Sequence, residues 1–144
     1  MPRLSPDRAE SDEWLWLEWT KVCQAKIQEL VLSEFVILNL DSPQNAYVQI
    51  AHVDADASRE LVVEASPGES ASSSLSSSLL DLGWEAPGSY AERGGPSPNY
   101  QVVWRWRETA DGVPKADAAD AASLVASTLR LAFAVVDPTV IRVE

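Results

Sequence analysis

Hydrophobic positions recur at three- and four-residue spacing after a polar start that contains two prolines, and this spacing predicts a long first helix. The stripe consists of Trp16, Trp19, Cys23, Ile27 and Leu30. We expect the helix to run from about Asp12 to Leu32, with Ser11 as its N-cap. Residues 1–10 are then a flexible lead-in.

The same helix is apolar outside its stripe. Trp14, Leu15, Leu17 and Val22 all fall on other sides of it. Two interpretations remain open, because a small domain can wrap a helix on two sides and an interface can also require apolar surface.

Three segments typical of β-strands follow in quick succession. They are Phe35 to Leu40, Ala46 to Val53 and Glu60 to Ala65. The links between them are short and polar, which favours antiparallel neighbours. In the third segment Leu61 and Val63 alternate with Glu60, Val62 and Glu64, so we expect one face of the sheet to meet solvent or a partner.

A serine-rich stretch comes next and predicts a short, weak helix from about Ala71 to Leu82. Gly83 stands where a left-handed helix stop belongs. Trp84 follows it, and we interpret this tryptophan as an anchor that joins the helix end to the sheet, although a binding role remains open.

The clearest alternation in the chain predicts a long strand from Asn99 to Glu108. One face carries Tyr100, Val102, Trp104 and Trp106, and for the two tryptophans core burial is the better interpretation. Arg105 and Arg107 lie on the other face, where they can pair with acids of the protein or with a carboxylate of a bound peptide. A strand edge beside them would accept an added strand.

The last helix is expected to begin after Asp117 as N-cap and to stop near Val135, before Pro138. The ending TVIRVE is either a terminal strand or a tail. The predicted fold class is therefore α+β, an antiparallel sheet with helices mostly on one face, in one domain over residues 11–144.

Charge and composition exclude several classes of function. The net charge of −11 repels phosphate backbones and anionic lipids, so we predict neither a nucleic-acid partner nor a membrane partner. Cys23 is the single cysteine, which fits a reducing compartment. Without a signal-peptide pattern or a long apolar run, the expected location is the cytoplasm.

Groups that carry catalysis are scarce. His52 is the single histidine and falls among apolar strand residues, and Cys23 falls on the buried stripe, so both are interpreted as structural. We predict no catalytic residue, no metal and no cofactor. The six tryptophans exceed what one small core needs, and tryptophan is enriched in binding hot spots.

The order of short motifs resembles a known family. A tryptophan-bearing first helix, a YVQI strand, LGW followed by proline, PNY opening a tryptophan-rich strand, and a last helix with STLR are similar to the bacterial YbjN-like, type III secretion chaperone-like family. This resemblance implies a secretion-chaperone-like fold of order α-β-β-β-α-β(-β)-α. It also implies a non-enzymatic protein that holds a client polypeptide on its sheet and first helix, with a homodimer as one option.

The resemblance leaves a fifth strand to be found, either in a hairpin over Glu108 to Val113 or in TVIRVE. Candidate peptide-binding residues are Trp14, Leu15, Trp84, Tyr100, Arg105 and Arg107. Two alternatives remain: a small-molecule sensor or regulatory domain with an apolar pocket between sheet and helices, and an enzyme built on Cys23 or His52.

Overall fold

A computed structural model describes residues 8–40, 46–55, 58–67, 73–87, 99–107, 112–138 and 141–143, with the backbone alone at residues 8–12, 55 and 73. Its helices are α1 (Arg8–Glu29), α2 (Ser73–Asp81) and α3 (Lys115–Ser127), and α3 continues as a π-helical turn, η2 (Thr128–Ala132). Its strands are β1 (Phe35–Leu40), β2 (Tyr47–Ala55), β3 (Ser58–Ser66), β4 (Tyr100–Arg107) and β5 (Ile141–Val143).

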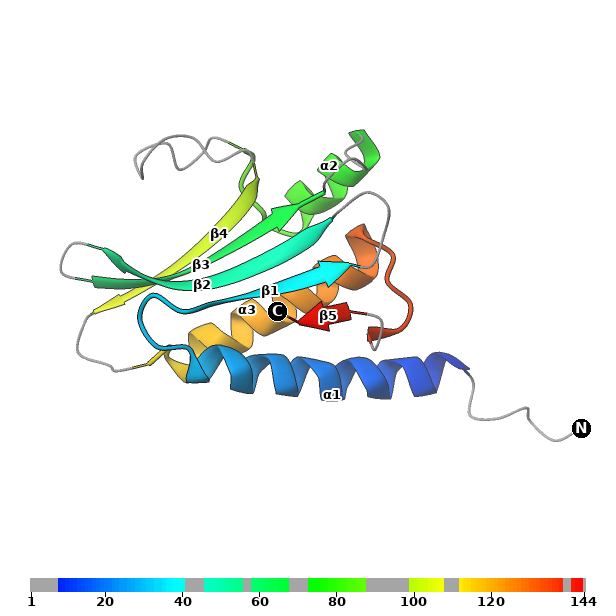
Figure 1. Ribbon diagram of the computed structural model, residues 1–144. Coiled ribbons are helices and arrows are strands. Elements are labelled where there is room, and N and C mark those ends of the chain that lie inside the picture. The colour runs from blue at the N-terminus through cyan, green and yellow to red at the C-terminus, as the bar shows by residue number, and fades with distance from the viewer. Residues whose placement is uncertain are drawn as a thin grey trace, which may run out of the picture.

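The strands form one antiparallel sheet in the order β4-β3-β2-β1-β5. Helices α1 and α3 pack on one face of this sheet, and α2 closes the end of the core beside β4 (Figure 1). No described helix covers the other face, which we call the open face. The α+β class and the placement of helices mostly on one face are confirmed.

The buried stripe of α1 follows the predicted spacing, with Trp16, Cys23 and Ile27 in the core and Trp19 half-buried. The predicted start of the helix was wrong. Helix α1 begins at Arg8, so Ser11 lies inside it and is not the N-cap. The residues before Ser11 are Arg, Ala and Glu, which favour helix and extend it by a turn.

Helix α1 ends earlier than Leu32, and a polar turn causes this. The carboxylate of Glu34 accepts a hydrogen bond from the Val31 amide at 2.8 Å, and Ser33 takes a positive φ of 76°. The Ser33 amide then donates to the His52 carbonyl at 2.8 Å. The chain is thereby turned directly into β1.

Helix α2 ends as predicted. Gly83 has a φ of +106°, and the amide of Trp84 donates to the Leu79 carbonyl at 3.1 Å. The Gly83 amide donates to the Leu80 carbonyl, which completes a Schellman motif. Because Leu79 and Trp84 are both buried, this cap also fixes the helix end onto the core.

The prediction that Asp117 is the N-cap of the last helix was wrong. Helix α3 begins at Lys115 after Pro114, which places Asp117 in the first turn. Proline fits this position because it lacks the amide hydrogen that would have no partner there. The regular α-helix also ends at Ser127, and the π-helical turn carries the chain on to Ala132.

The ending TVIRVE supplies the fifth strand. Ile141 and Arg142 of β5 pair with Leu40 and Asn39 of β1. The other place considered for a fifth strand, Glu108 to Val113, lies mostly outside the described residues, and so does the DSPQN link. Of the lead-in predicted over residues 1–10, residues 1–7 lie outside the described residues and residues 8–10 belong to α1.

Candidate functional site

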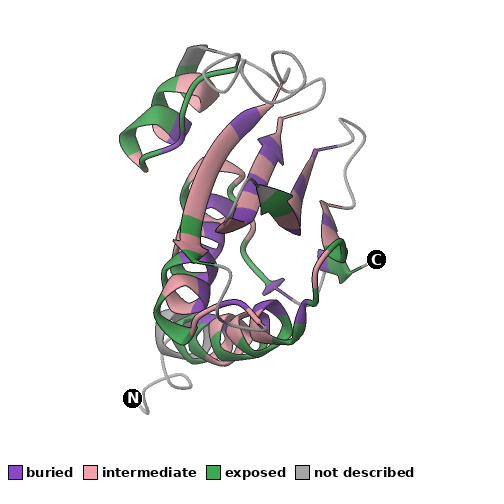
Figure 2. Cartoon of the chain, turned by 90° about the vertical axis from the view of Figure 1, so that its left-hand side faces the viewer, coloured by how far each residue is buried: buried purple, intermediate pink, exposed green. Residues whose placement is uncertain are grey.

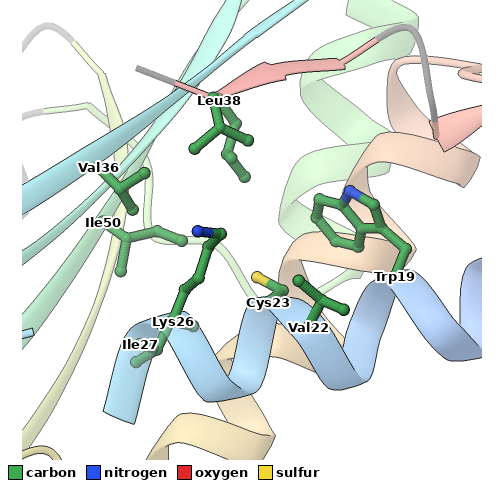
Figure 3. Close-up of a pocket in the computed structure, with 9 residues that line it drawn as sticks. Trp19, Val22, Cys23, Lys26, Ile27, Val36, Leu38 and Ile50 are labelled. Carbon is green, nitrogen blue, oxygen red and sulfur yellow. The ribbon is translucent and has the colours of Figure 1, made fainter. Parts of the chain in front are cut away.

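An open apolar groove lies between α1 and the sheet edge formed by β1 and β5. The space between its walls, about 340 Å³, is partly open to solvent, and its lining residues are Trp19, Val22, Cys23, Lys26, Ile27, Val36, Leu38, Ile50 and Val143. Figure 3 shows side chains from α1 and from the strands pointing toward one another across this space. Residues at the helical spacing of α1 therefore form one wall, and alternate residues of β1 form the other.

Val22 and Lys26 decide the chemistry of the groove. Val22 is 55% exposed although it is apolar, and Lys26 is the one charged residue of the lining. The Lys26 side chain extends from α1 toward Ile50 and Val36 (Figure 3). A ligand with an apolar side chain and a nearby carboxylate would cover the Val22 side chain and pair with the Lys26 ammonium group.

The edge of β1 is partly uncovered beside this groove. Strand β5 pairs with Leu38, Asn39 and Leu40, and its pairing stops there within the described residues. In an antiparallel ladder alternate residues turn their main-chain groups to the same side. Phe35 and Ile37 therefore present main-chain groups on the β5 side without a described partner strand.

The groove contains no activated nucleophile. Cys23 is buried, and this burial raises the pKa of its thiol to about 12, which keeps the sulfur protonated and unreactive near neutral pH. His52 is fully buried elsewhere, with its Nδ1 3.0 Å from the Leu30 carbonyl and its ring against Trp106. The carbonyl can only accept, so Nδ1 carries the proton. Neither residue is exposed in a cleft beside acids, as an enzyme built on either one would require.

The predicted peptide-binding residues fall into three separate places. Trp14 and Leu15 lie on α1, where Trp14 is 60% exposed and Leu15 is half-buried. Figure 2 shows exposed residues along the side of α1 that faces away from the sheet. This apolar excess of α1 is therefore not wrapped on two sides by the described chain.

Trp84 and Tyr100 lie in the core. Trp84 is 2% exposed, and its indole N–H donates to the Thr128 hydroxyl at 2.8 Å. The Tyr100 hydroxyl is 2.6 Å from the hydroxyl of Ser76. Both side chains are buried and held by these neighbours.

Arg105 and Arg107 lie on the open face of β4, at the far edge of the sheet from the groove. The Nε and Nη2 atoms of Arg105 are both 2.7 Å from one carboxylate oxygen of Glu60, which is fully buried. The Arg105 side chain remains 61% exposed. Arg107 is exposed and makes no ion pair within the described part of the chain.

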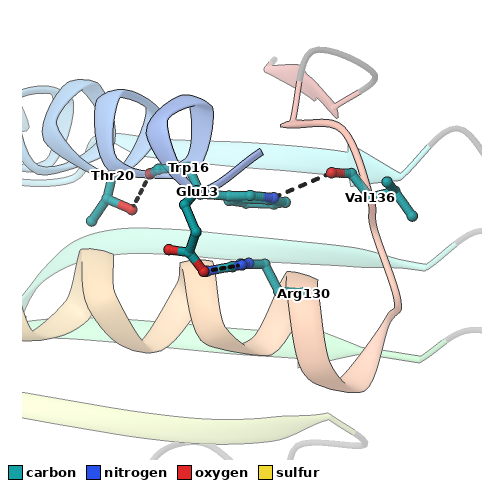
Figure 4. Close-up of polar contacts among 5 residues, drawn as sticks. All are labelled: Glu13, Trp16, Thr20, Arg130 and Val136. Carbon is teal, nitrogen blue, oxygen red and sulfur yellow. Dashed lines mark hydrogen bonds and ion pairs between the residues drawn. The ribbon is translucent and has the colours of Figure 1, made fainter. Parts of the chain in front are cut away.

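A second hollow lies between α1 and α3, and its contacts are structural. Arg130 of η2 donates to the Glu13 carboxylate at 2.8 Å and lies over the Trp16 ring, 5.6 Å from its centre. The Trp16 indole donates to the Val136 carbonyl at 3.3 Å (Figure 4). These bonds fix the π-helical end of α3 to the start of α1.

Sequence reasoning missed most of the groove. Val22 was noticed as apolar outside the stripe, but Lys26, Val36 and Val143 carried no signal of their own. They come together only because β5 pairs with β1 and α1 crosses beneath them.

Two kinds of feature are missing from the described residues. They hold no group of three or more metal-ligating side chains. They also hold no helix that is long and apolar enough to span a membrane.

Comparison with known proteins yields one match. The family model TY-Chap3, described as T3SS (YopN, CesT) and YbjN peptide-binding chaperone 3, matches residues 8–144. No curated protein and no solved structure matches the chain. Because the match covers nearly the whole sequence, from the first turn of α1 to the last residue, the chain belongs to this family of peptide-binding chaperones.

Proposed function

We propose that this protein is a non-enzymatic chaperone that holds an extended client segment on α1 and the adjoining sheet edge. The observation that carries the proposal is the apolar groove beside an uncovered stretch of β1. An extended segment laid there can place alternate side chains in the groove and pair its main chain with Phe35 and Ile37.

The chemistry of the groove indicates which client residues it prefers. The lining is apolar apart from Lys26, so an apolar side chain fills the groove and a neighbouring acid pairs with the ammonium group. Exposed Trp14 lies nearer the start of α1 and offers further apolar contact area.

The small-molecule sensor is the weaker candidate. Ligand pockets combine an apolar lining with several convergent polar groups that fix orientation. The groove offers one such group, Lys26. A polypeptide needs fewer polar side chains because its main chain supplies hydrogen bonds.

Two matched substitutions test the proposal. Peptides selected from a random library with the wild-type protein are measured against Val22→Asp and Val136→Asp. Both valines are exposed, at 55% and 65%, but only Val22 lines the groove. We expect V22D to weaken binding at least about tenfold, because an apolar client group would cover its carboxylate. V136D should bind as the wild type does.

Equal losses in both variants, or no enrichment of any peptide by folded wild-type protein, would contradict the proposal. A thermal-shift screen of metabolites on the same three proteins addresses the sensor. If a metabolite raises the unfolding midpoint of the wild type but not that of V22D, and no peptide binds, the protein is a sensor and not a chaperone.

A further inference from the structure

The outer edge of β4 is open over half its length. Gln101 exchanges main-chain hydrogen bonds with Glu85 on the side away from β3, at 2.9 and 3.2 Å. Since alternate residues of a strand turn their amides and carbonyls to the same side, Val103, Arg105 and Arg107 also point theirs outward. These three residues have no described main-chain partner on that side.

The side chains of the same three residues point to the open face. Val103, Arg105 and Arg107 are opposite Val62, Glu60 and Ser58 of β3. A strand added outside β4 would place alternate residues directly opposite these three, with side chains on the same face. The identities of Val103, Arg105 and Arg107 therefore select what the added strand carries.

Strand β3 shows which residues suit this row. Opposite Arg105 it places Glu60, and opposite Val103 it places the apolar Val62. Opposite Gln101 it places Glu64, whose carboxylate accepts a hydrogen bond from the side-chain amide (Nε2) of Gln101 at 2.6 Å. On one side of β4, Arg105 thus already has an acid opposite it and Val103 an apolar residue, whereas Arg107 has the uncharged Ser58.

Charge complementarity identifies the occupant of the other side. The chain carries 22 acidic and 11 basic residues, so the protein as a whole is negatively charged. Two exposed arginines on one strand place local positive charge on this acidic surface. Arg105 uses Nε and Nη2 for Glu60, and its remaining N–H groups are available to a second carboxylate. Arg107 has its whole guanidinium available within the described structure.

We propose that the outer edge of β4, from Val103 to Arg107, binds an extended acidic segment of the client by strand addition. The segment reads acid-x-acid-x-apolar if it runs antiparallel to β4, and apolar-x-acid-x-acid if it runs parallel. This inference rests on the proposed function, because it names a client segment. It concerns the sheet edge opposite the groove, so the two surfaces hold separate segments.

Synthetic peptides test the inference directly. The probes contain Glu-Thr-Glu-Thr-Val, its reverse Val-Thr-Glu-Thr-Glu, and Lys-Thr-Lys-Thr-Val as the charge control, and their Kd values are measured by fluorescence anisotropy. We expect one of the two glutamate peptides to bind at least about tenfold more tightly than the lysine peptide, with the difference shrinking as salt is added.

Main-chain pairing has its own readout. In a peptide bound antiparallel to β4 the Glu and Val amides face β4 and the Thr amides point away, whereas in a peptide bound parallel the Thr amides face β4 and the Glu and Val amides point away. For Glu-Thr-Glu-Thr-Val bound antiparallel, N-methylation of the central Glu should abolish binding and N-methylation of a Thr should leave it nearly unchanged. For Val-Thr-Glu-Thr-Glu bound parallel, the two N-methylations should have the opposite effects. Val103→Pro should also abolish binding, because it removes an outward amide that β3 does not use.

Arg107→Glu and Arg142→Glu form the matched pair of variants. Both arginines are exposed strand residues, but Arg142 lies on β5 at the opposite edge. R107E should weaken the glutamate peptide about fivefold or more, and R142E should not change it. Arg105 is left intact here because the buried Glu60 depends on it.

Three results would overturn the inference: equal effects of R107E and R142E, equal effects of the two N-methylations, or no binding of either glutamate peptide at millimolar concentrations. The groove experiment keeps the two proposals distinguishable. If library peptides still bind the wild type and fail on V22D while the glutamate peptides do not bind, the β4 inference falls and the proposed function stands.

Discussion

The two edges of the sheet are built in opposite ways. At the β4 edge polar groups are fixed by specific bonds: Arg105 holds the buried Glu60, the Trp84 indole binds Thr128, and Glu85 pairs with Gln101. At the β5 edge the groove is lined almost entirely by apolar side chains, and β5 covers only part of β1. Directional bonds fix register and charge, whereas apolar contacts tolerate different shapes. We therefore expect the β4 edge to select by sequence and the groove to select by hydrophobicity.

The largest effect on stability should come from Trp84, which joins the end of α2 to the core beside β4. Trp84→Ala removes a fully packed indole and should lower the free energy of unfolding by about 3–5 kcal/mol. Trp14→Ala is the matched control, since Trp14 is exposed on α1, and it should change stability by less than about 0.5 kcal/mol. Urea unfolding followed by circular dichroism measures both. Similar losses would mean that Trp14 is packed as Trp84 is.

The next effect concerns the ion pair of the β4 edge. Arg105→Ala leaves the buried Glu60 carboxylate without its arginine and should cost about 2 kcal/mol, less than a fully buried pair would because Arg105 is largely exposed. Replacing both residues by valine should recover most of that loss. If E60V/R105V is no more stable than R105A, the loss of stability in R105A does not come from the buried Glu60 carboxylate that has lost its arginine.

The groove side should respond to pH. In the folded protein the Cys23 thiol has a pKa of about 12, above its usual value of 9.0, so only the unfolded chain releases this proton between these values. The contribution of Cys23 to stability is complete below pH 9 and is lost as the pH rises toward 12, by up to about 1.4 kcal/mol per pH unit.

The difference between wild type and Cys23→Ala isolates this effect from other groups that titrate in the same range. Urea unfolding at a series of pH values from neutral to mildly alkaline should show the wild type losing stability faster than C23A above pH 9. Parallel pH curves for the two proteins would show that the thiol titrates normally and is accessible to solvent.

The smallest effect should come from the turn that delivers Glu85 to β4. Gly83→Ala meets no atom within 4 Å, so its cost is the left-handed backbone alone, about 1 kcal/mol. Gly83→Asn should cost less, because asparagine visits this conformation more readily. Thermal unfolding should give midpoints that fall from wild type to G83N to G83A. A midpoint of G83A equal to that of the wild type would contradict the Schellman motif at Gly83.

Several parts of the fold could be read from the sequence because they depend on local order. The α1 stripe, the alternation of β4 and the stop at Gly83 each follow from spacing within one element. The errors lie at helix boundaries, namely the starts of α1 and α3 and the end of α1. Ser11 and Asp117 are good N-cap residues, yet the helices begin earlier, because neighbouring residues also favour helix and nothing local forbids extension.

The candidate site was predicted only in part. Arg105 and Arg107 were placed on an exposed strand face, and that placement holds. Trp84 and Tyr100 could not be distinguished from contact residues by sequence, because a tryptophan or tyrosine suits a core and an interface equally well. Burial by α2 and η2 places them in the core.

By itself the sequence determined the α+β class, the element order up to β4, the weak serine-rich helix and the acidic charge, all of which depend on residue type and on spacing along the chain. Tertiary structure decided what spacing cannot encode. Pairing of β5 with β1 shaped the groove, and pairing of Glu85 with Gln101 set which main-chain groups of β4 face outward. Both are contacts between distant segments, whose register follows from packing of the whole chain.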